Sequence, residues 1–118
     1  MFDPNDFWTF AEKLLDSSAP DECACRVAAG RAYYAMFLML KRSLQDRHGV
    51  KFDNDARDHS RVVRTLKERR KFPLANAVNN LNRLREKADY DLGATVDYDA
   101  VSFEIDQYRM QFENTKVY

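Results

Sequence analysis

Residues 27–40 read VAAGRAYYAMFLML, and twelve of these 14 residues are apolar or aromatic. A helix that is hydrophobic all round is buried on every side, either at the centre of a bundle or in a membrane. A membrane span needs about 20 apolar residues, whereas this run ends at Lys41 and Arg42. The stretch therefore predicts the central helix of a soluble bundle.

Arg31 is the one charged residue in this run. Leaving a deeply buried guanidinium without a partner costs several kcal/mol, so a carboxylate or carbonyl is expected beside it. We expect Arg31 to form a structural ion pair with an acid of the segment 89–91, either Asp89 or Asp91. Such a pair would tie the central helix to the end of a later helix.

The length and composition describe one globular domain that spans residues 1–118. The chain is 45% hydrophobic and 32% charged, which is ordinary for a protein with a packed core. No basic segment followed by an apolar stretch opens the sequence, so we expect no secretory signal and a cytoplasmic location. With two cysteines and two histidines, reduced thiols are expected and neither a metal nor another cofactor is.

The net charge is zero, but the charges are unevenly distributed along the chain. Residues 26–87 hold 16 basic and six acidic side chains, a balance of +10, and each flank carries −5. One interpretation is complementary, solvated helix faces, and the other is a basic face for an anionic partner such as RNA. On the second interpretation, Arg61 and Arg64 of a strongly basic helix are candidate phosphate contacts.

Apolar residues recur at helical spacing throughout the chain, and no segment favours a strand. The expected helices cover about 4–17, 18–48, 59–70 and 98–115, and a further helix begins near 74 and ends in the region 88–93. Ser18, Asp58 and either Thr95 or Asp97 are expected N-caps, and Gly49 is an expected C-terminal stop. The first helix is expected to bury Phe7, Phe10, Ala11, Leu14 and Leu15. Short connections favour an all-α antiparallel bundle of four to five helices.

Three segments of the chain are similar to motifs of one protein family. Residues 30–37, GRAYYAMF, resemble the "SRAYYAAF" signature of the small stand-alone branch of the HEPN superfamily. Residues 84–91, LREKADYD, resemble the "LRxxADYD" element of that branch, and residues 58–63, DHSRVV, are similar to the "tHsgv" between them. Order and spacing agree over nearly the whole chain.

The resemblance implies a helical bundle that usually forms a homodimer and acts on RNA. Relatives include metal-independent ribonucleases, non-catalytic proteins, and members paired with a minimal nucleotidyltransferase as toxin–antitoxin partners. Active members use an arginine followed, after four to six residues, by a histidine. Arg85 occupies the arginine position, and Tyr90 stands where the histidine would be.

The replacement of that histidine by Tyr90 favours binding over cleavage. Metal-free cleavage of RNA needs a base that titrates near neutrality, whereas an unperturbed tyrosine has a pKa of about 10. We expect a non-catalytic protein that binds RNA or a partner protein, with Arg85 as a phosphate contact. The alternative is a weak ribonuclease in which Arg85 and Tyr90 form the catalytic site at a dimer cleft. His59 would take part only if its helix packs beside Arg85; otherwise it is structural or exposed.

Overall fold

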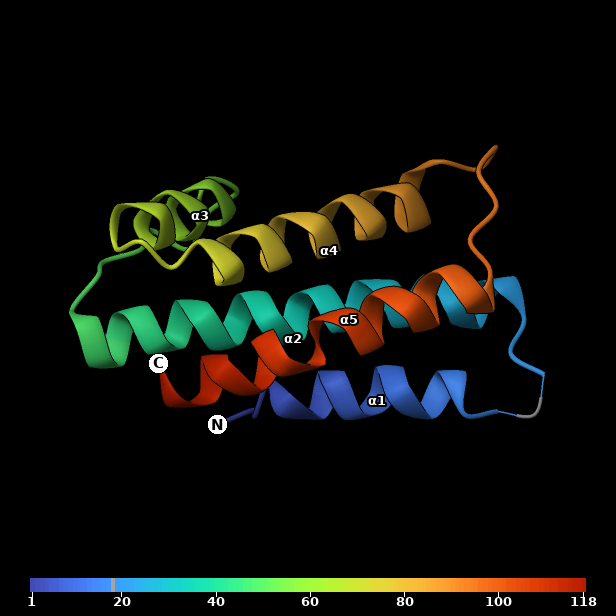
Figure 1. Ribbon diagram of the computed structural model, residues 1–118. Helices are drawn as coiled ribbons and strands as arrows, with labels where there is room; N and C mark the ends of the chain where they lie inside the picture. Colours follow the sequence, from blue (N-terminus) through green and yellow to red (C-terminus); the bar gives the residue numbers. More distant parts are fainter. Residues whose placement is uncertain (18) are drawn as a thin grey trace.

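The computed structural model describes residues 1–17 and 19–118, and in this part of the chain every regular element is a helix. The helices are α1 (Asn5–Leu15), α2 (Glu22–His48), α3 (Asp58–Glu68), α4 (Phe72–Tyr90) and α5 (Tyr98–Val117). In Figure 1, the axes of α1, α2, α4 and α5 lie roughly parallel to one line. The chain runs in opposite directions in α1 and α2, and again in α4 and α5. The predicted all-α bundle is confirmed.

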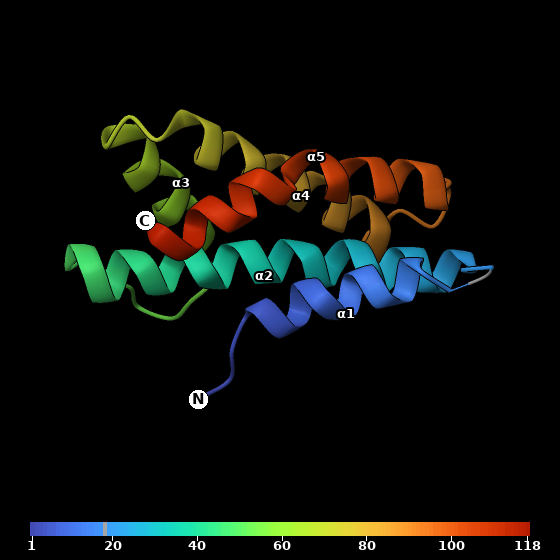
Figure 2. The same ribbon diagram turned by 60° about the horizontal axis from the view of Figure 1, so that its bottom comes forward.

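The bundle is organised around α2, as the apolar run predicted. This 27-residue helix packs against all four other helices. Figure 2 shows it in the middle of the bundle, with α1 on one side and α3, α4 and α5 on the other. The molecule measures 43 × 26 × 25 Å. Among the described residues, no helix is both long enough and apolar enough to cross a membrane.

One stripe of α2 is less buried than the sequence predicted. Val27 is 42% exposed, and Arg31, Tyr34 and Leu38, which follow it at steps of three and four, are half-buried. Residues at that spacing share one helix face. The expectation of burial on every side is therefore wrong for this face, because α1 covers it only in part.

The side of α1 that packs into the core differs from the predicted side. Ala11 and Leu15 are buried as expected, but Phe10 is 47% exposed. Trp8 is buried in its place, with its ring stacked on Phe112 of α5 at a centroid distance of 4.4 Å. Aromatic and aliphatic residues cover a wide sector of α1, so periodicity alone does not say which edge the core covers.

The ends of α2 and α5 confirm two of the predicted signals. Gly49 follows α2 in the left-handed conformation, with φ of 67°, as a C-terminal glycine does. Asp97 caps α5 by accepting a hydrogen bond from the Ala100 backbone N–H at 3.0 Å. At the start of α2 the cap is Asp21, which accepts from the Ala24 N–H at 2.8 Å. The expected cap Ser18 lies outside the described residues.

The start of α3 differs from the prediction. Asp58 is its first residue, not its side-chain cap, and its carboxylate is buried 2.8 Å from the Lys41 ammonium of α2. Burial opposes ionisation, but the contacts with Lys41 and Arg61 hold the pKa of Asp58 below its usual value. Asp58 thus fastens α3 to α2.

A tight corner joins α3 to α4. Arg70 takes a φ of 60°, and the Lys71 N–H donates to the Leu66 carbonyl at 2.8 Å. Pro73 lies in the first turn of α4, where its missing N–H costs no hydrogen bond. The Phe72-Pro73 pair therefore begins α4, and this corner lays α3 against α4.

Candidate functional site

A pocket of about 530 Å³ lies where α2, α3 and the last turns of α4 meet. Its walls carry Tyr33, Tyr34 and Phe37 from α2, His59 and Ser60 from α3, Asn82, Arg85, Glu86 and Tyr90 from α4, and Asp55 and Ala56 from the loop before α3. The two motif residues predicted as the site, Arg85 and Tyr90, therefore line one pocket of a single chain.

Arg85 is held in place by contacts on several sides. Its Nε donates to Asn82 Oδ1 at 3.0 Å, and one terminal nitrogen lies 3.3 Å from Asp89 Oδ2. Its guanidinium carbon lies 5.2 Å from the centre of the Tyr33 ring and 5.7 Å from that of Tyr34. Stacking on aromatic faces is favourable for a planar guanidinium. Arg85 is thus pre-oriented, with its side chain 14% exposed.

Arg85 and Tyr90 both belong to α4, which ends at Tyr90, and their side chains nevertheless come close to each other. Residues five apart on a helix are offset by about 140°, so they point to different sides. Tyr90 is the last residue of α4, and Asp91 leaves the helix with extended backbone angles. The Tyr90 ring centre is 5.9 Å from the Arg85 guanidinium, and the side chain is 74% exposed.

His59 joins this pocket through the packing of α3 on α4. Its Nε2 lies 3.1 Å from Asn79 Oδ1, which can only accept, so Nε2 carries the proton. Its Nδ1 then accepts from the Tyr33 hydroxyl at 2.7 Å. Burial lowers the pKa of His59, so the ring is neutral at pH 7. Neither ring nitrogen is free to take a proton from a ligand in this arrangement.

Sequence reasoning placed Arg85 and Tyr90 but left His59 open and assigned Tyr33 to the core. The condition stated for His59 is met, because α3 does pack beside Arg85. The signal that pointed to it was the short motif around Asp58 and His59. Tyr33 lies within the motif at residues 30–37, but its hydroxyl meets His59 only once α2 and α3 are packed.

Arg61 is already paired with carboxylates of the protein. Its guanidinium lies 2.8 Å from Asp53, 3.1 Å from Asp58 and 3.8 Å from Asp55. Three carboxylates thus surround its guanidinium, and the phosphate contact expected of Arg61 stays a prediction. The loop before α3 supplies two of these acids, Asp53 and Asp55.

Arg64 lies on the outer face of α3 and is exposed. Its nearest carboxylate is Glu68, at 3.9 Å, and both side chains are about 70% exposed, so this pair holds Arg64 weakly. Arg64 lines a second hollow, of about 390 Å³, with Lys67 of α3 and Asn79 of α4. An anion can reach Arg64 at this position, which is compatible with the prediction that Arg64 contacts phosphate.

The predicted ion pair of Arg31 with Asp89 or Asp91 does not form. The Arg31 guanidinium lies over the Phe7 ring at 4.8 Å and the Tyr34 ring at 5.3 Å, on the half-buried stripe of α2. Asp89 pairs with Arg85 instead, and Asp91 accepts from the Gly93 N–H. A partly solvated guanidinium needs no carboxylate, which is why the argument from deep burial fails here.

Arg26, five residues earlier in the same helix, joins α2 to the end of α4. One terminal nitrogen donates to the Ala88 carbonyl at 2.8 Å and to the Asp91 carbonyl at 3.2 Å, and the other donates to the Ala94 carbonyl at 2.8 Å. Glu22 accepts from the same guanidinium at 3.0 Å. The expected link between these helices therefore exists, but Arg26 makes it.

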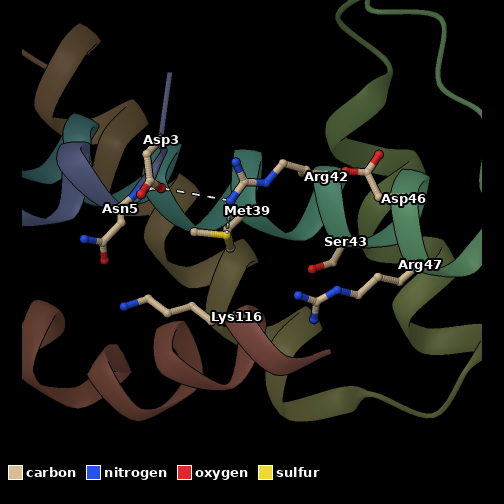
Figure 3. A pocket seen from close by; sticks show the side chains of 8 residues that line it. All are labelled: Asp3, Asn5, Met39, Arg42, Ser43, Asp46, Arg47 and Lys116. Carbon is tan, nitrogen blue, oxygen red and sulfur yellow. Dashed lines mark hydrogen bonds and ion pairs between the residues drawn. The ribbon is translucent and has the colours of Figure 1, made fainter. Parts of the chain in front are cut away.

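Another hollow, of about 340 Å³, lies between the start of the chain, the second half of α2 and the end of α5. Figure 3 shows Arg42 facing Asp3, at 4.0 Å, and Arg47 and Lys116 on its rim. Asp46 also lines it, so both acids and bases border this hollow, and no aromatic ring is among the described residues that line it. Within residues 1–17 and 19–118, no cluster of three or more His, Cys, Asp or Glu side chains could hold a metal ion. The pocket of Arg85 and His59 is therefore the stronger candidate site.

One archaeal protein has a sequence similar to this chain. The uncharacterized protein MJ0992 of Methanocaldococcus jannaschii is 32% identical over 119 aligned residues, which cover 86% of this chain and 67% of the relative. The chain belongs to the family of that protein. No family model matches the sequence, and no solved structure matches it. Because the relative is itself uncharacterized, the function has to be argued from the pocket.

Proposed function

We propose that this chain is a non-catalytic, RNA-binding protein of the HEPN type that acts in the cytoplasm, in a toxin–antitoxin or defence-type system. The motif resemblance supports the class, and the five-helix bundle is compatible with it. The observation that carries RNA binding is the pocket in which Arg85 lies among tyrosine rings, with its guanidinium oriented by Asn82 and Asp89.

This pocket has the two features that single-stranded RNA requires. Aromatic faces stack on unpaired bases, and a guanidinium binds the phosphate. Tyr90 and the half-buried Tyr34 offer rings at the rim, and Arg85 supplies the cation. Asp89 is 40% and Glu86 57% exposed at the side chain, so both can turn to water when a phosphate replaces them.

The test compares RNA binding by the unmodified protein and by an Arg85→Ala variant. Binding is measured by fluorescence anisotropy of a labelled single-stranded RNA. Arg83→Ala is the matched control, because Arg83 is an exposed arginine of the same helix that donates a hydrogen bond to Asn80. Arg85→Ala should weaken binding and lower the salt slope by about 0.7, the value for one phosphate contact on a single strand. Circular dichroism checks the fold. Equal affinities for the two variants would contradict the proposal.

A second candidate function is metal-independent cleavage of RNA. It is favoured by one observation, that Arg85, Tyr90 and His59 line the same pocket. Against it, both His59 nitrogens are hydrogen-bonded within the protein, and Tyr90 stands where active HEPN members carry histidine. Incubation of the protein with total RNA in EDTA, beside Arg85→Ala, tests it. Tyr90→His introduces, at an exposed position, the histidine that active HEPN members carry at this place in the motif. Cleavage gained by that variant would show that the chain lacks only the catalytic base.

The proposal includes a homodimer and a nucleotidyltransferase as partner, both taken from the resemblance. The chain has a mass of 13.9 kDa, so light scattering on the purified protein distinguishes monomer from dimer directly. A monomer at all concentrations used for RNA binding would remove the dimer from the proposal and leave the single-chain pocket as the complete site.

A further inference from the structure

We infer that bound RNA continues from the Arg85 pocket along the outer face of α3, where Arg64 and Lys67 bind its phosphates. This inference rests on the proposed function and specifies the path of the RNA. We call the surface formed by Ser60, Arg64 and Lys67 the α3 outer face. These residues are spaced by four and three, so they lie on one side of the helix.

The pocket and the α3 outer face form one continuous surface. His59 and Ser60 line both the Arg85 pocket and the second hollow, which extends to Lys67. Asn79 of α4 forms the opposite wall of that hollow and also accepts a hydrogen bond from His59. The two hollows are therefore neighbours, with His59 and Ser60 between them, and a strand that leaves the first pocket past Ser60 reaches the second directly.

The charge of α3 is divided between its two sides. Toward the loop that precedes the helix, Arg61 is neutralised by Asp53, Asp55 and Asp58. On the outer face, Lys67 has no ion pair among the described residues, and Arg64 has only the exposed contact with Glu68. Beyond Lys67, the corner carries the cations 69–71, which have no carboxylate partners among the described residues. Free positive charge thus gathers where a phosphate backbone would lie.

The length of this face sets the size of the binding site. Eight residues separate His59 from Lys67, which is about 12 Å at 1.5 Å per helical residue. Stacked nucleotides advance about 3.4 Å each along one strand, so the face accommodates about four nucleotides beyond the pocket. A short RNA that fills only the pocket would not reach Lys67.

The experiment measures the affinity of oligoadenylates of two to ten nucleotides for the unmodified chain, Arg85→Ala, Arg64→Ala, Lys67→Ala and the double variant of Arg64 and Lys67. Lys13→Ala is the control, since Lys13 is an exposed lysine of α1 without an ion pair among the described residues. In Figures 1 and 2, α1 and α3 lie on opposite sides of α2. Thermal melts verify that each exposed-residue variant is folded.

We expect affinity to increase with length up to about five nucleotides and then to level off. Arg64→Ala and Lys67→Ala should each weaken octamer binding about threefold to fivefold, the double variant more, and trimer binding should be unchanged. If all three variants bound the octamer as tightly as Lys13→Ala does, the proposed RNA path along α3 would be wrong. If Arg85→Ala still weakened binding in that case, the Arg85 pocket would remain supported as the RNA site. Weaker octamer binding by these variants, with no effect of Arg85→Ala, would support the path and overturn the pocket.

Discussion

At the scale of single residues, the protonation of His59 decides which chemistry the pocket can perform. Its Nε2 donates to Asn79, its Nδ1 accepts from Tyr33, and burial lowers its pKa. Burial also raises the pKa of Tyr33, so the hydroxyl keeps its proton and remains the donor. The pair is locked in a neutral state that favours binding of a ligand over proton transfer to it.

Substitution of Tyr33 by Phe should raise the pKa of His59. The lost hydrogen bond stabilises the neutral ring, so its removal favours the protonated form. A proton NMR titration of the unmodified protein should give a His59 midpoint below 6.5, and the Tyr33→Phe midpoint should be higher. His48 provides a second histidine signal in the same spectra. A midpoint that does not move would mean that Tyr33 does not donate to the ring.

The lowered pKa of His59 also has a consequence for stability. Because the unfolded chain takes up this proton near pH 6.5 and the folded chain only at lower pH, the free energy of unfolding should fall as pH decreases through 6.5. His59→Gln should reduce that pH dependence between pH 7 and 5. The measurement is urea unfolding at several pH values.

At the scale of the helices, Arg26 is the link between α2 and the end of α4. It donates to the carbonyls of Ala88, Asp91 and Ala94, where α4 has ended and its last carbonyls lack helical partners. The Tyr90 rim of the pocket is part of the same segment. Arg26 therefore supports the site from outside it.

Arg26→Met should lower the free energy of unfolding by about 2 kcal/mol, because it leaves carbonyls in a part-buried segment without a donor. Arg31→Met is the matched control within α2. It removes only contacts with the rings of Phe7 and Tyr34, worth about 0.5–1 kcal/mol. Urea melts compare the two. A larger loss for Arg31→Met would reverse these assignments.

The corner between α3 and α4 is strained at Arg70. Its φ of 60° places it in the left-handed region, where a side chain costs about 1 kcal/mol and glycine is preferred. Arg70→Gly should therefore leave the protein as stable as before or more stable by up to about 1 kcal/mol, after the added freedom of the unfolded chain is included. Thermal unfolding measures this, and a clear loss of stability would mean that the Arg70 side chain stabilises the corner.

At the scale of the whole molecule, the stacked rings of Trp8 and Phe112 join the two ends of the chain. Trp8 is on α1 and Phe112 on α5, and both are buried. In Figure 1, the N- and C-terminal ends of the chain lie at the same end of the bundle. The core is thus closed by a contact between its first and last helices.

Phe112→Ala should destabilise the protein by about 3–5 kcal/mol, the cost of a large cavity in a core. Trp8 is the single tryptophan, so its fluorescence reports this contact alone. In the unmodified protein, fluorescence and far-ultraviolet circular dichroism should give the same unfolding transition. If α1 detached before the rest unfolded, fluorescence would change first, and the contact would not contribute to the cooperative core.

The local features of this protein could be read from the sequence alone. Periodicity gave the five helices, the apolar run 27–40 identified the central one, and Gly49 and Asp97 marked helix ends. These signals act within a few residues, since helical hydrogen bonds and caps join near neighbours in the chain. The motif at 84–91 likewise marked both Arg85 and Tyr90, whose side chains approach each other in the last turns of α4.

Only the tertiary structure decided which side chains meet across the bundle. Arg26 contacts carbonyls 62 to 68 residues away, and His59 meets Tyr33 and Asn79 from two other helices. It also showed that Trp8, not Phe10, enters the core, that Arg61 is neutralised and that Arg31 lies at a half-solvated edge. Periodicity defines an apolar stripe but not the neighbour that covers each edge of it. That neighbour sets the burial and the charge of each side chain, and with them its chemistry.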